Sequence, residues 1–462
     1  MKPFSHDAMT TRTSPGPTPP RQRTRDHAPN GVATRVAEAL RPFLPPGRSP
    51  VRLRCWDGSE AGPADAPVVV IRTPRALRRI LWQPGELGLA EAYIAGEIDT
   101  DGDLGSALAH VWAGLAGRPA ARPRPGDLAH AGRVALGLGA LGPRPAPPGA
   151  PRARLQGRLH TTSRDRAAIS HHYDLSNAFY SLLLDETMAY SSAYWRQPES
   201  AAYGLADAQR DKLDLICRKL GLEPGMRLLD IGCGWGSLAV HAAREHHVRV
   251  TAVTLSAEQA DHVRARVVRE GLDDLVEVEL RHYRDIASGG YDAVTAIEMG
   301  EHVGDADYPD FAALLHRMLR PRGRALVQQM SRGSTAPGGG PFIETYIAPD
   351  MHMRPVGQTL TLLEAAGLEV RSTESLREHY VTTIAAWHRT LEDRWDDFVG
   401  LVGEPTARVW RLYLVGSGLA FAQHRMGVDQ ILAVRTDDRG TASMPATPAS
   451  WYGSGVAGEE TA

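Results

Sequence analysis

Residues 228–236 read LLDIGCGWG, an apolar run followed by an acid and three alternate glycines. The apolar run is typical of a buried strand. Glycine lets the backbone turn sharply and approach a ligand without a Cβ in the way. The helical pattern SLAVHAAREH follows directly at 237–246. The stretch therefore predicts a strand, a glycine-rich turn and a helix, with a ligand bound at the turn.

Strand and helix patterns alternate on both sides of this turn. Strands are predicted at 226–232, 248–256, 275–280, 291–299 and 323–330, and helices at 237–246, 257–272 and 308–319. Strands separated by helices of this length predict an α/β fold with a parallel, doubly wound sheet. More helix is expected from about 384 to 428.

The chain divides into five expected segments. They are a disordered tail (1–30), a smaller α+β domain (31–117), an Arg/Pro/Gly-rich linker with a short amphipathic helix in its middle (118–163), the large α/β domain (164–435) and a loose C-terminal tail (436–462).

Composition narrows the class of protein. No apolar run approaches the roughly 20 residues that span a bilayer. The three cysteines, Cys55, Cys217 and Cys233, form no ligand spacing, so neither a metal site nor a disulfide framework is expected. Ten arginines but only two acids lie between Arg118 and Arg166. This run suits an anionic surface, and a solvated linker remains the alternative.

The glycine turn alone does not choose between NAD, FAD and S-adenosylmethionine. Its spacing is G-x-G-x-G after an acid, whereas the dinucleotide fingerprint is G-x-G-x-x-G. The second strand ends in Thr254-Leu255-Ser256, where a dinucleotide fold usually places an acid. The pattern resembles motif I of the class I S-adenosylmethionine-dependent methyltransferases.

Several separate stretches extend this resemblance. They are HHYDLSNAFYSLLLDETMAYSSAYW (171–195), VTLSAEQ (253–259), EMGEHVG (298–304), FIETYIAP (342–349) and REHYVTT (377–383). Together, over about 165–435, the chain resembles the cyclopropane-fatty-acyl-phospholipid synthases and mycolic acid cyclopropane synthases. The resemblance implies a Rossmann-like methyltransferase domain and S-adenosylmethionine as cofactor. It also implies that the enzyme forms a cyclopropane on an unsaturated phospholipid acyl chain.

The resemblance also assigns cofactor contacts. Those expected are Tyr190 and Ser191 at the methionine end; Asp230, Gly232, Gly234 and Gly236 in the loop beneath; Thr254, Leu255 and Gln259 at the ribose; and Tyr283, Arg284 and Ile297 around adenine.

The chemistry requires a base in a dry site. An alkene that takes a methyl group leaves a carbocation, which water would quench and from which a base must remove a proton. In the family that base is thought to be a bound bicarbonate, and Glu301 and Tyr380 match residues that hold it. Ser192 and Gln328 stand where relatives carry Cys and His. Each can still offer a hydrogen bond, the serine through its backbone amide.

Glu298 and His302 are expected to be structural, since many relatives carry a small residue at the position of Glu298. Whether the product is a ring or a methylene or methyl branch stays open. A methyltransferase of a soluble small molecule and a non-catalytic lipid-binding protein are also alternatives. A nucleic-acid substrate is not expected, because no base-reading motif is present.

Access to phospholipid implies docking on an anionic membrane surface. The arginine-rich segment 118–166 and the N-terminal domain are the expected docking surfaces, at the inner, cytoplasmic face of the membrane. Residues 331–355 are expected to form a lid over the apolar channel. A homodimer is left open.

Overall fold

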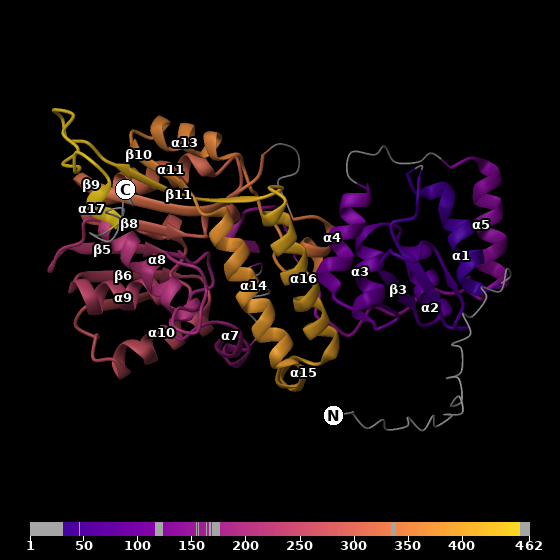
Figure 1. The fold of residues 1–462 in the computed structure, drawn as a ribbon. Helices are drawn as coiled ribbons and strands as arrows, with labels where there is room; N and C mark the ends of the chain where they lie inside the picture. The colour runs from indigo at the N-terminus through magenta and orange to yellow at the C-terminus, as the bar shows by residue number, and fades with distance from the viewer. Residues whose placement is uncertain are drawn as a thin grey trace, which may run out of the picture.

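The computed structural model describes residues 31–45, 47–115, 123–153, 155, 157–162, 164–165, 168, 176–333 and 339–452. The expected tail 1–30 and residues 453–462 lie outside these ranges. Two bodies lie side by side in Figure 1, a large α/β domain and a smaller N-terminal unit, with α3 and α4 next to α16.

The large domain is built on a seven-stranded sheet in the order β10-β11-β9-β8-β5-β6-β7. Its strands are β5 (Arg227–Ile231), β6 (Arg249–Thr254), β7 (Val276–Leu280), β8 (Tyr291–Ile297), β9 (Leu319–Ser331), β10 (Glu369–Ser375) and β11 (Gly427–Val434). Strands β5 to β9 pair in parallel, which confirms the predicted α/β class. The prediction missed β10 and β11, and β11 runs antiparallel to both of its neighbours.

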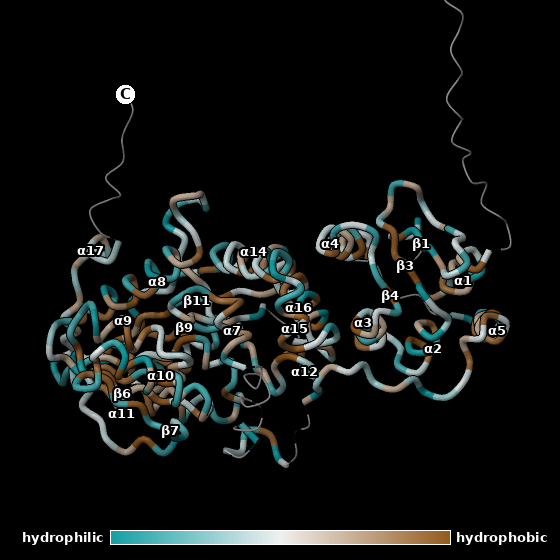
Figure 2. Tube along the Cα trace, turned by 90° about the horizontal axis from the view of Figure 1, so that it is seen from below, coloured by the Kyte–Doolittle hydropathy of each residue, from teal (hydrophilic) through white to brown (hydrophobic). Residues whose placement is uncertain are grey.

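Helices cover both faces of this sheet, because its strands alternate their apolar side chains between the two faces. Leu228 packs with one cluster, to which α8, α9 and α10 contribute, and Leu229 packs with another, to which α11 and α13 contribute. These helices are α8 (Leu205–Leu220), α9 (Ser237–His246), α10 (Ala257–Arg269), α11 (Tyr308–Met318) and α13 (Val356–Ala365). Figure 2 shows hydrophobic residues along the strands of this sheet, between the helices.

A helical layer joins the large domain to the N-terminal unit. It consists of α7 (Asn177–Leu183), α12 (Pro341–Tyr346), α14 (Arg377–Asp393), α15 (Trp395–Val402) and α16 (Glu404–Ala422). Its core is aromatic: Phe179 lies 4.8 Å from Trp410 and 5.1 Å from Phe398 between ring centroids. Aromatic side chains bury large areas, so this layer gives the large domain a rigid wall.

The N-terminal unit has its own four-stranded sheet, in the order β2-β1-β3-β4. The strands are β1 (Arg52–Cys55), β2 (Glu60–Ala61), β3 (Val68–Ile71) and β4 (Ile98–Asp101), and the helices are α1 (Val32–Leu40), α2 (Pro74–Trp82), α3 (Glu86–Ile94), α4 (Leu104–Leu115) and α5 (Pro125–Gly137). Helix α5 lies inside the expected linker. Its residue Val134 and the adjoining Leu138 pack into the core of the N-terminal unit, so part of this segment belongs to that unit.

Charged side chains connect the two bodies. Arg408 on α16 donates to Asp99 Oδ2 at 3.1 Å and to the carbonyl oxygen of Tyr93 at 3.2 Å. Arg152 pairs with Glu91 and donates to the hydroxyl of Tyr346 at 2.9 Å. Within the described ranges, part of the linker therefore holds α3 against α12.

The expected loose tail contains one short helix, α17 (Ala449–Tyr452), in which Trp451 is buried. Tyr452 donates to Glu374 on β10 at 3.0 Å. Among the helices of the described residues, none is long and apolar enough to cross a membrane.

We predict that Arg79→Ala strongly destabilises the N-terminal unit. Arg79 is 3% exposed and donates to Glu97 through two bonds of 2.9 and 3.0 Å. Its loss would leave Glu97 and Glu91 buried without that cation, at a cost of about 3–5 kcal/mol. Chemical denaturation measures the change. The matched control, Arg75→Ala, removes a 57% exposed partner of the same Glu97 and should cost about 1 kcal/mol or less. Equal losses would contradict the prediction.

Candidate active site

The turn between β5 and α9 forms one wall of a pocket. Gly232 and Gly236 both have φ of 79°, in the left-handed region. A Cβ on Gly232 would lie 2.8 Å from Met299, and one on Gly236 would lie 2.8 Å from Val263. Gly234 has open space where a Cβ would stand. Gly232 and Gly236 therefore let the turn pack closely against Met299 and Val263. Gly234 leaves the backbone of the turn accessible to a ligand.

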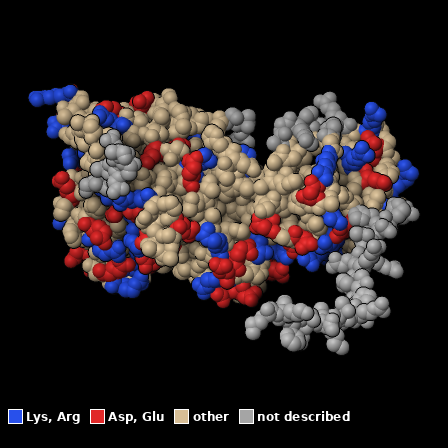
Figure 3. All heavy atoms as spheres, in the orientation of Figure 1, with Lys and Arg blue, Asp and Glu red and all other residues tan. Residues whose placement is uncertain are grey.

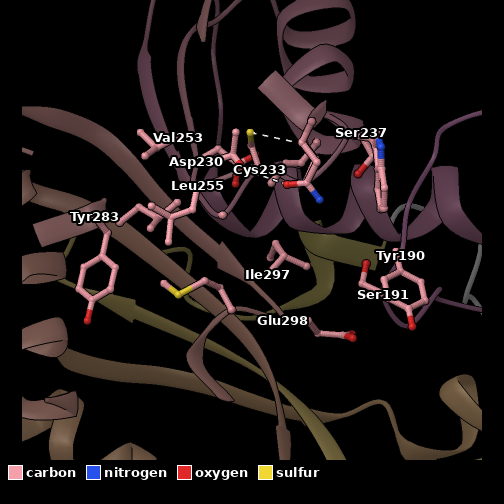
Figure 4. Close-up of a pocket in the computed structure, with 18 of the residues that line it drawn as sticks. Tyr190, Ser191, Asp230, Cys233, Ser237, Val253, Leu255, Tyr283, Ile297 and Glu298 are labelled. Atoms are coloured by element: carbon pink, nitrogen blue, oxygen red, sulfur yellow. Dashed lines mark hydrogen bonds between the residues drawn. The ribbon is translucent and has the colours of Figure 1, made fainter. Parts of the chain in front are cut away.

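The structure brings together most of the residues expected to bind the cofactor. Those that line the pocket are Tyr190, Ser191, Asp230, Gly232, Gly234, Thr254, Leu255, Gln259, Tyr283 and Ile297. Figure 4 shows Tyr283 at one end, Tyr190 and Ser191 at the other, and Ile297 between them.

Two expected contacts are not among the lining residues. Gly236 instead begins α9 as its N-cap. Arg284 pairs with Asp307 at 3.2 Å and donates to the carbonyl oxygen of His160. Its neighbour Tyr283 is the residue of this pair that faces the pocket.

The donors at the middle of the pocket fit a ribose. Gln259 accepts a hydrogen bond from Thr254 Oγ1 at 2.8 Å through its Oε1. Its Nε2 is buried and, within the described residues, has no hydrogen-bond partner. An unpaired buried donor is costly, so a bound acceptor would be favoured here. A ribose hydroxyl oxygen would satisfy it, which matches the ribose position expected for Gln259.

Lys212 is a pocket residue that the sequence analysis did not single out. Its ammonium donates to Ser191 Oγ at 2.8 Å, and burial lowers its pKa to about 8. Asp230 accepts from Thr295 at 2.8 Å, and burial raises its pKa to about 6. Lys212 and Asp230 are thus a cation and an acid in the pocket that could pair with the two charges of an amino-acid group. The chain has only three lysines, and this scarcity was the sequence signal that could have drawn attention to Lys212.

Glu298 lies where three of the expected catalytic residues meet, at the Tyr190 end of the pocket (Figure 4). Its Oε1 accepts from the backbone N–H of Ser192 at 2.7 Å and from Nε2 of Gln328 at 2.9 Å. Its Oε2 accepts from the Tyr380 hydroxyl at 2.9 Å. The sequence analysis gave Glu298 a structural role, whereas the structure places its carboxylate among the donors expected to hold bicarbonate.

Glu301 lies beside Glu298 and is 1% exposed. Burial and the neighbouring Glu298 raise the pKa of Glu301 well above its usual range. Its Oε2 has no hydrogen-bond partner in the part of the chain that the structure describes. Burial lowers the pKa of His302 to about 4, so this histidine is neutral near pH 7.

A second cavity, of about 1790 Å³, adjoins this point. Tyr190, Glu298 and His302 line both it and the cofactor pocket. Its walls come from the N-terminal unit, α14, α16 and the expected lid, and include the apolar residues Ile71, Leu108, Trp112, Phe342, Ile384 and Met353. Figure 3 shows the surface hollowed where the two bodies meet, with few charged side chains there.

One side-chain group departs from the expectation about cysteines. Cys217 on α8 lies with His241 and His246, which α9 carries, and their potential ligand atoms are all within 4.8 Å of one another. His241 Nε2 and Asp214 Oδ1 lie 2.9 Å apart and share a hydrogen bond whose donor depends on the histidine tautomer. The sequence spacing gave no sign of this group, because its members come from two helices.

Comparison with known proteins gives consistent results. Residues 160–431 match the family described as mycolic acid cyclopropane synthetase. A probable fatty acid methyltransferase of Mycobacterium tuberculosis, Rv3720, is 40% identical, over 90% of this chain and 98% of that protein. The cyclopropane-fatty-acyl-phospholipid synthase of Escherichia coli K12 is 33% identical, over 82% and 90%. Mycolic acid cyclopropane synthase CmaA1 complexed with SAH and CTAB aligns with a TM-score of 0.55 and 31% identity, over 58% and 98%.

We predict that Gln259→Leu weakens binding of S-adenosylmethionine about 5-fold, because one hydrogen bond is worth about 1 kcal/mol. Isothermal titration calorimetry measures the dissociation constant. The control is Asp261→Asn, which lies on the same helix with a side chain 77% exposed and should leave binding unchanged. Unaltered binding by Gln259→Leu would remove this residue from the cofactor site.

Proposed function

The chain belongs to the mycolic acid cyclopropane synthetase family and is an S-adenosylmethionine-dependent methyltransferase. From that premise we propose that it alkylates the double bond of an unsaturated acyl chain in a phospholipid and closes a cyclopropane ring. The observation that carries this proposal is the large apolar cavity that meets the cofactor pocket at Tyr190 and Glu298.

The cavity supports a long apolar substrate. Its volume of about 1790 Å³ exceeds the range of about 300–1000 Å³ that is usual for small-molecule sites. Phe342, Ile343 and Met351, from the expected lid, close one side of it. A closed polar pocket would have favoured a soluble small molecule instead.

The residues around the junction have separable tasks. When bound, S-adenosylmethionine supplies an electrophilic methyl group on a sulfonium. Apolar side chains keep water from the acyl carbocation that methyl transfer leaves behind. The aromatic ring of Tyr190, which lines both cavities, stands where it can stabilise positive charge through its π face. The acids at the junction can receive the proton that the product must lose.

Membrane access is proposed at the N-terminal unit. Several residues that line the cavity there are also exposed to solvent: Leu40, Phe43, Leu81 and Leu89, at 40, 39, 50 and 52%. Arg41 also lines the cavity and suits anionic headgroups. We therefore place the enzyme on the inner face of the membrane, with its cavity open to lipid.

Not every arginine of the segment 118–166, which the sequence analysis expected to dock on the membrane, is available for docking. Arg152 and Arg164 pair with Glu91 and Asp350, so these two guanidinium groups serve internal ion pairs. We propose docking through the exposed leucines, the other basic side chains of segment 118–166 and those of the N-terminal unit.

A branched product is the second candidate. It is favoured by the 40% identical relative, which is named a fatty acid methyltransferase rather than a cyclopropane synthase. The same carbocation, after a hydride shift, can lose a proton to give a methylene branch.

The first test incubates the enzyme with methyl-labelled S-adenosylmethionine and phosphatidylglycerol vesicles that carry monounsaturated chains. We expect mass spectrometry to find one labelled carbon in the acyl chain, and we expect the product to resist hydrogenation, as a ring does. A product that takes up hydrogen would mean a methylene branch. If the lipid stays unlabelled while S-adenosylmethionine still binds, the proposed function is wrong.

The second test addresses the proposed mouth of the cavity. The double variant Leu81→Glu with Leu89→Glu should reduce vesicle binding at least 10-fold, because it places charges where apolar side chains would enter the bilayer. Vesicle co-sedimentation measures binding. Val268→Glu, at a 69% exposed apolar residue of α10 that does not line the cavity, is the matched control. If the double variant and the Val268→Glu control lose vesicle binding equally, or if neither loses it, the cavity does not open to the membrane at Leu81 and Leu89.

A further inference from the structure

Three hydrogen-bond donors from distant parts of the chain meet at one carboxylate. Ser192 offers its backbone N–H from the loop before α8, Gln328 its side-chain amide from β9, and Tyr380 its hydroxyl from α14. All three distances lie between 2.7 and 2.9 Å, and all three bonds end on Glu298. Such convergence on one half-buried carboxylate stabilises its ionised form.

The amide of Gln328 is fixed in the orientation that donates. Its Oε1 accepts from Nε2 of Gln430 on β11 at 3.1 Å. The Oε1 of Gln430 in turn accepts from Lys219 Nζ at 2.5 Å. Because this chain of bonds begins at an ammonium, which can only donate, it leaves Gln328 Nε2 directed at Glu298.

The charge balance assigns different states to the two neighbouring acids. Burial raises the pKa of Glu298 above its usual range, and its three donors limit that rise. Glu301 lacks such donors on Oε2, and the charge of Glu298 raises its pKa further. These contacts favour the proton on Glu301, the more buried of the two carboxyls, and the ionised form of the half-buried Glu298.

Glu298 also has the right position for proton transfer. It lines both the cofactor pocket and the apolar cavity, so it borders the space where an acyl carbon would meet the methyl donor. The backbone of Glu298 is in the left-handed region, with φ of 50°. This conformation turns the chain at the end of β8 and is unfavourable for a residue other than glycine.

We propose that the carboxylate of Glu298 is itself the base of the reaction and stands in the place that the family resemblance gives to a bicarbonate. This inference rests on the proposed alkylation. Bicarbonate does not fit beside the residues present, because Ser192, Gln328 and Tyr380 already donate to Glu298 and a second anion would face an uncompensated charge. A small residue at this position, as in many relatives, would leave room for the ion.

The proposed step balances. The alkene π pair forms a C–C bond to the methyl carbon, and the C–S pair remains on sulfur as S-adenosylhomocysteine. The other alkene carbon is then cationic. Glu298 removes one proton from the transferred methyl group, and the C–H pair closes the ring. Glu298 becomes a carboxylic acid and later returns that proton to solvent.

The decisive experiment compares activity in buffer depleted of carbon dioxide with activity after bicarbonate is added. The wild-type enzyme should work equally well in both. Glu298→Ala should lose at least 100-fold in kcat while S-adenosylmethionine still binds. Bicarbonate or formate should restore at least 10-fold of that loss, by filling the space that the deleted carboxylate leaves. Glu298→Gln keeps that space filled and should be equally impaired but not restored.

Two results would overturn the proposal. One is wild-type activity that falls without carbon dioxide and returns with bicarbonate. The other is Glu298→Ala activity within a few-fold of wild type. A titration followed by NMR of carbon-13 bicarbonate needs no lipid: Glu298→Ala should bind the ion and the wild type should not. If no lipid is alkylated at all, the proposed function fails, while this titration still decides whether Glu298 occupies the anion site.

Discussion

The structure depends most on how it compensates a carboxylate that is partly removed from water. Glu298 is half-buried where the cofactor pocket meets the apolar cavity, and a charge there that lacked hydrogen-bond donors would be costly. The chain meets this constraint with an N–H, an amide and a phenol drawn from three different layers of the fold. As a result, the sheet, the loop before α8 and helix α14 are all hydrogen-bonded to the carboxylate of Glu298.

The exclusion of water from the site has a second consequence. Electrostatic interactions are stronger where water is excluded, so one acid can remain charged while its neighbour stays neutral. The walls that exclude water are not confined to the methyltransferase domain. Helices α3 and α4 and the N-terminal sheet contribute to the large cavity. The N-terminal unit is therefore part of the reaction chamber, joined to α16 by the bonds of Arg408 to Asp99 and Tyr93.

The sequence was informative wherever the signal was local. The glycine turn, the alternation of strands and helices and most of the cofactor contacts follow from short stretches, since one strand and one turn carry each of them. Glu298 was missed because its importance comes from Ser192, Gln328 and Tyr380, which are far away in the chain. Arg284 was assigned to the pocket although its partner is Asp307, since adjacent residues cannot be told apart without the turn's geometry. Strand β11 was missed because it follows the long helix α16 closely, and β10 was missed because its sequence, EVRSTES, is mostly polar.

Strand β11 has a consequence for the order in which the enzyme is made. It lies between β9 and β10 in the sheet, although it is synthesised after every other strand that the structure describes. The side chain that orients Gln328 belongs to Gln430 on this strand. A nascent chain can therefore complete the turn after β5 while Glu298, the proposed proton acceptor at the end of β8, still lacks its full set of partners. During translation the glycine turn after β5 is therefore available first. The hydrogen bonds around Glu298 are completed only later, once β11 has been synthesised.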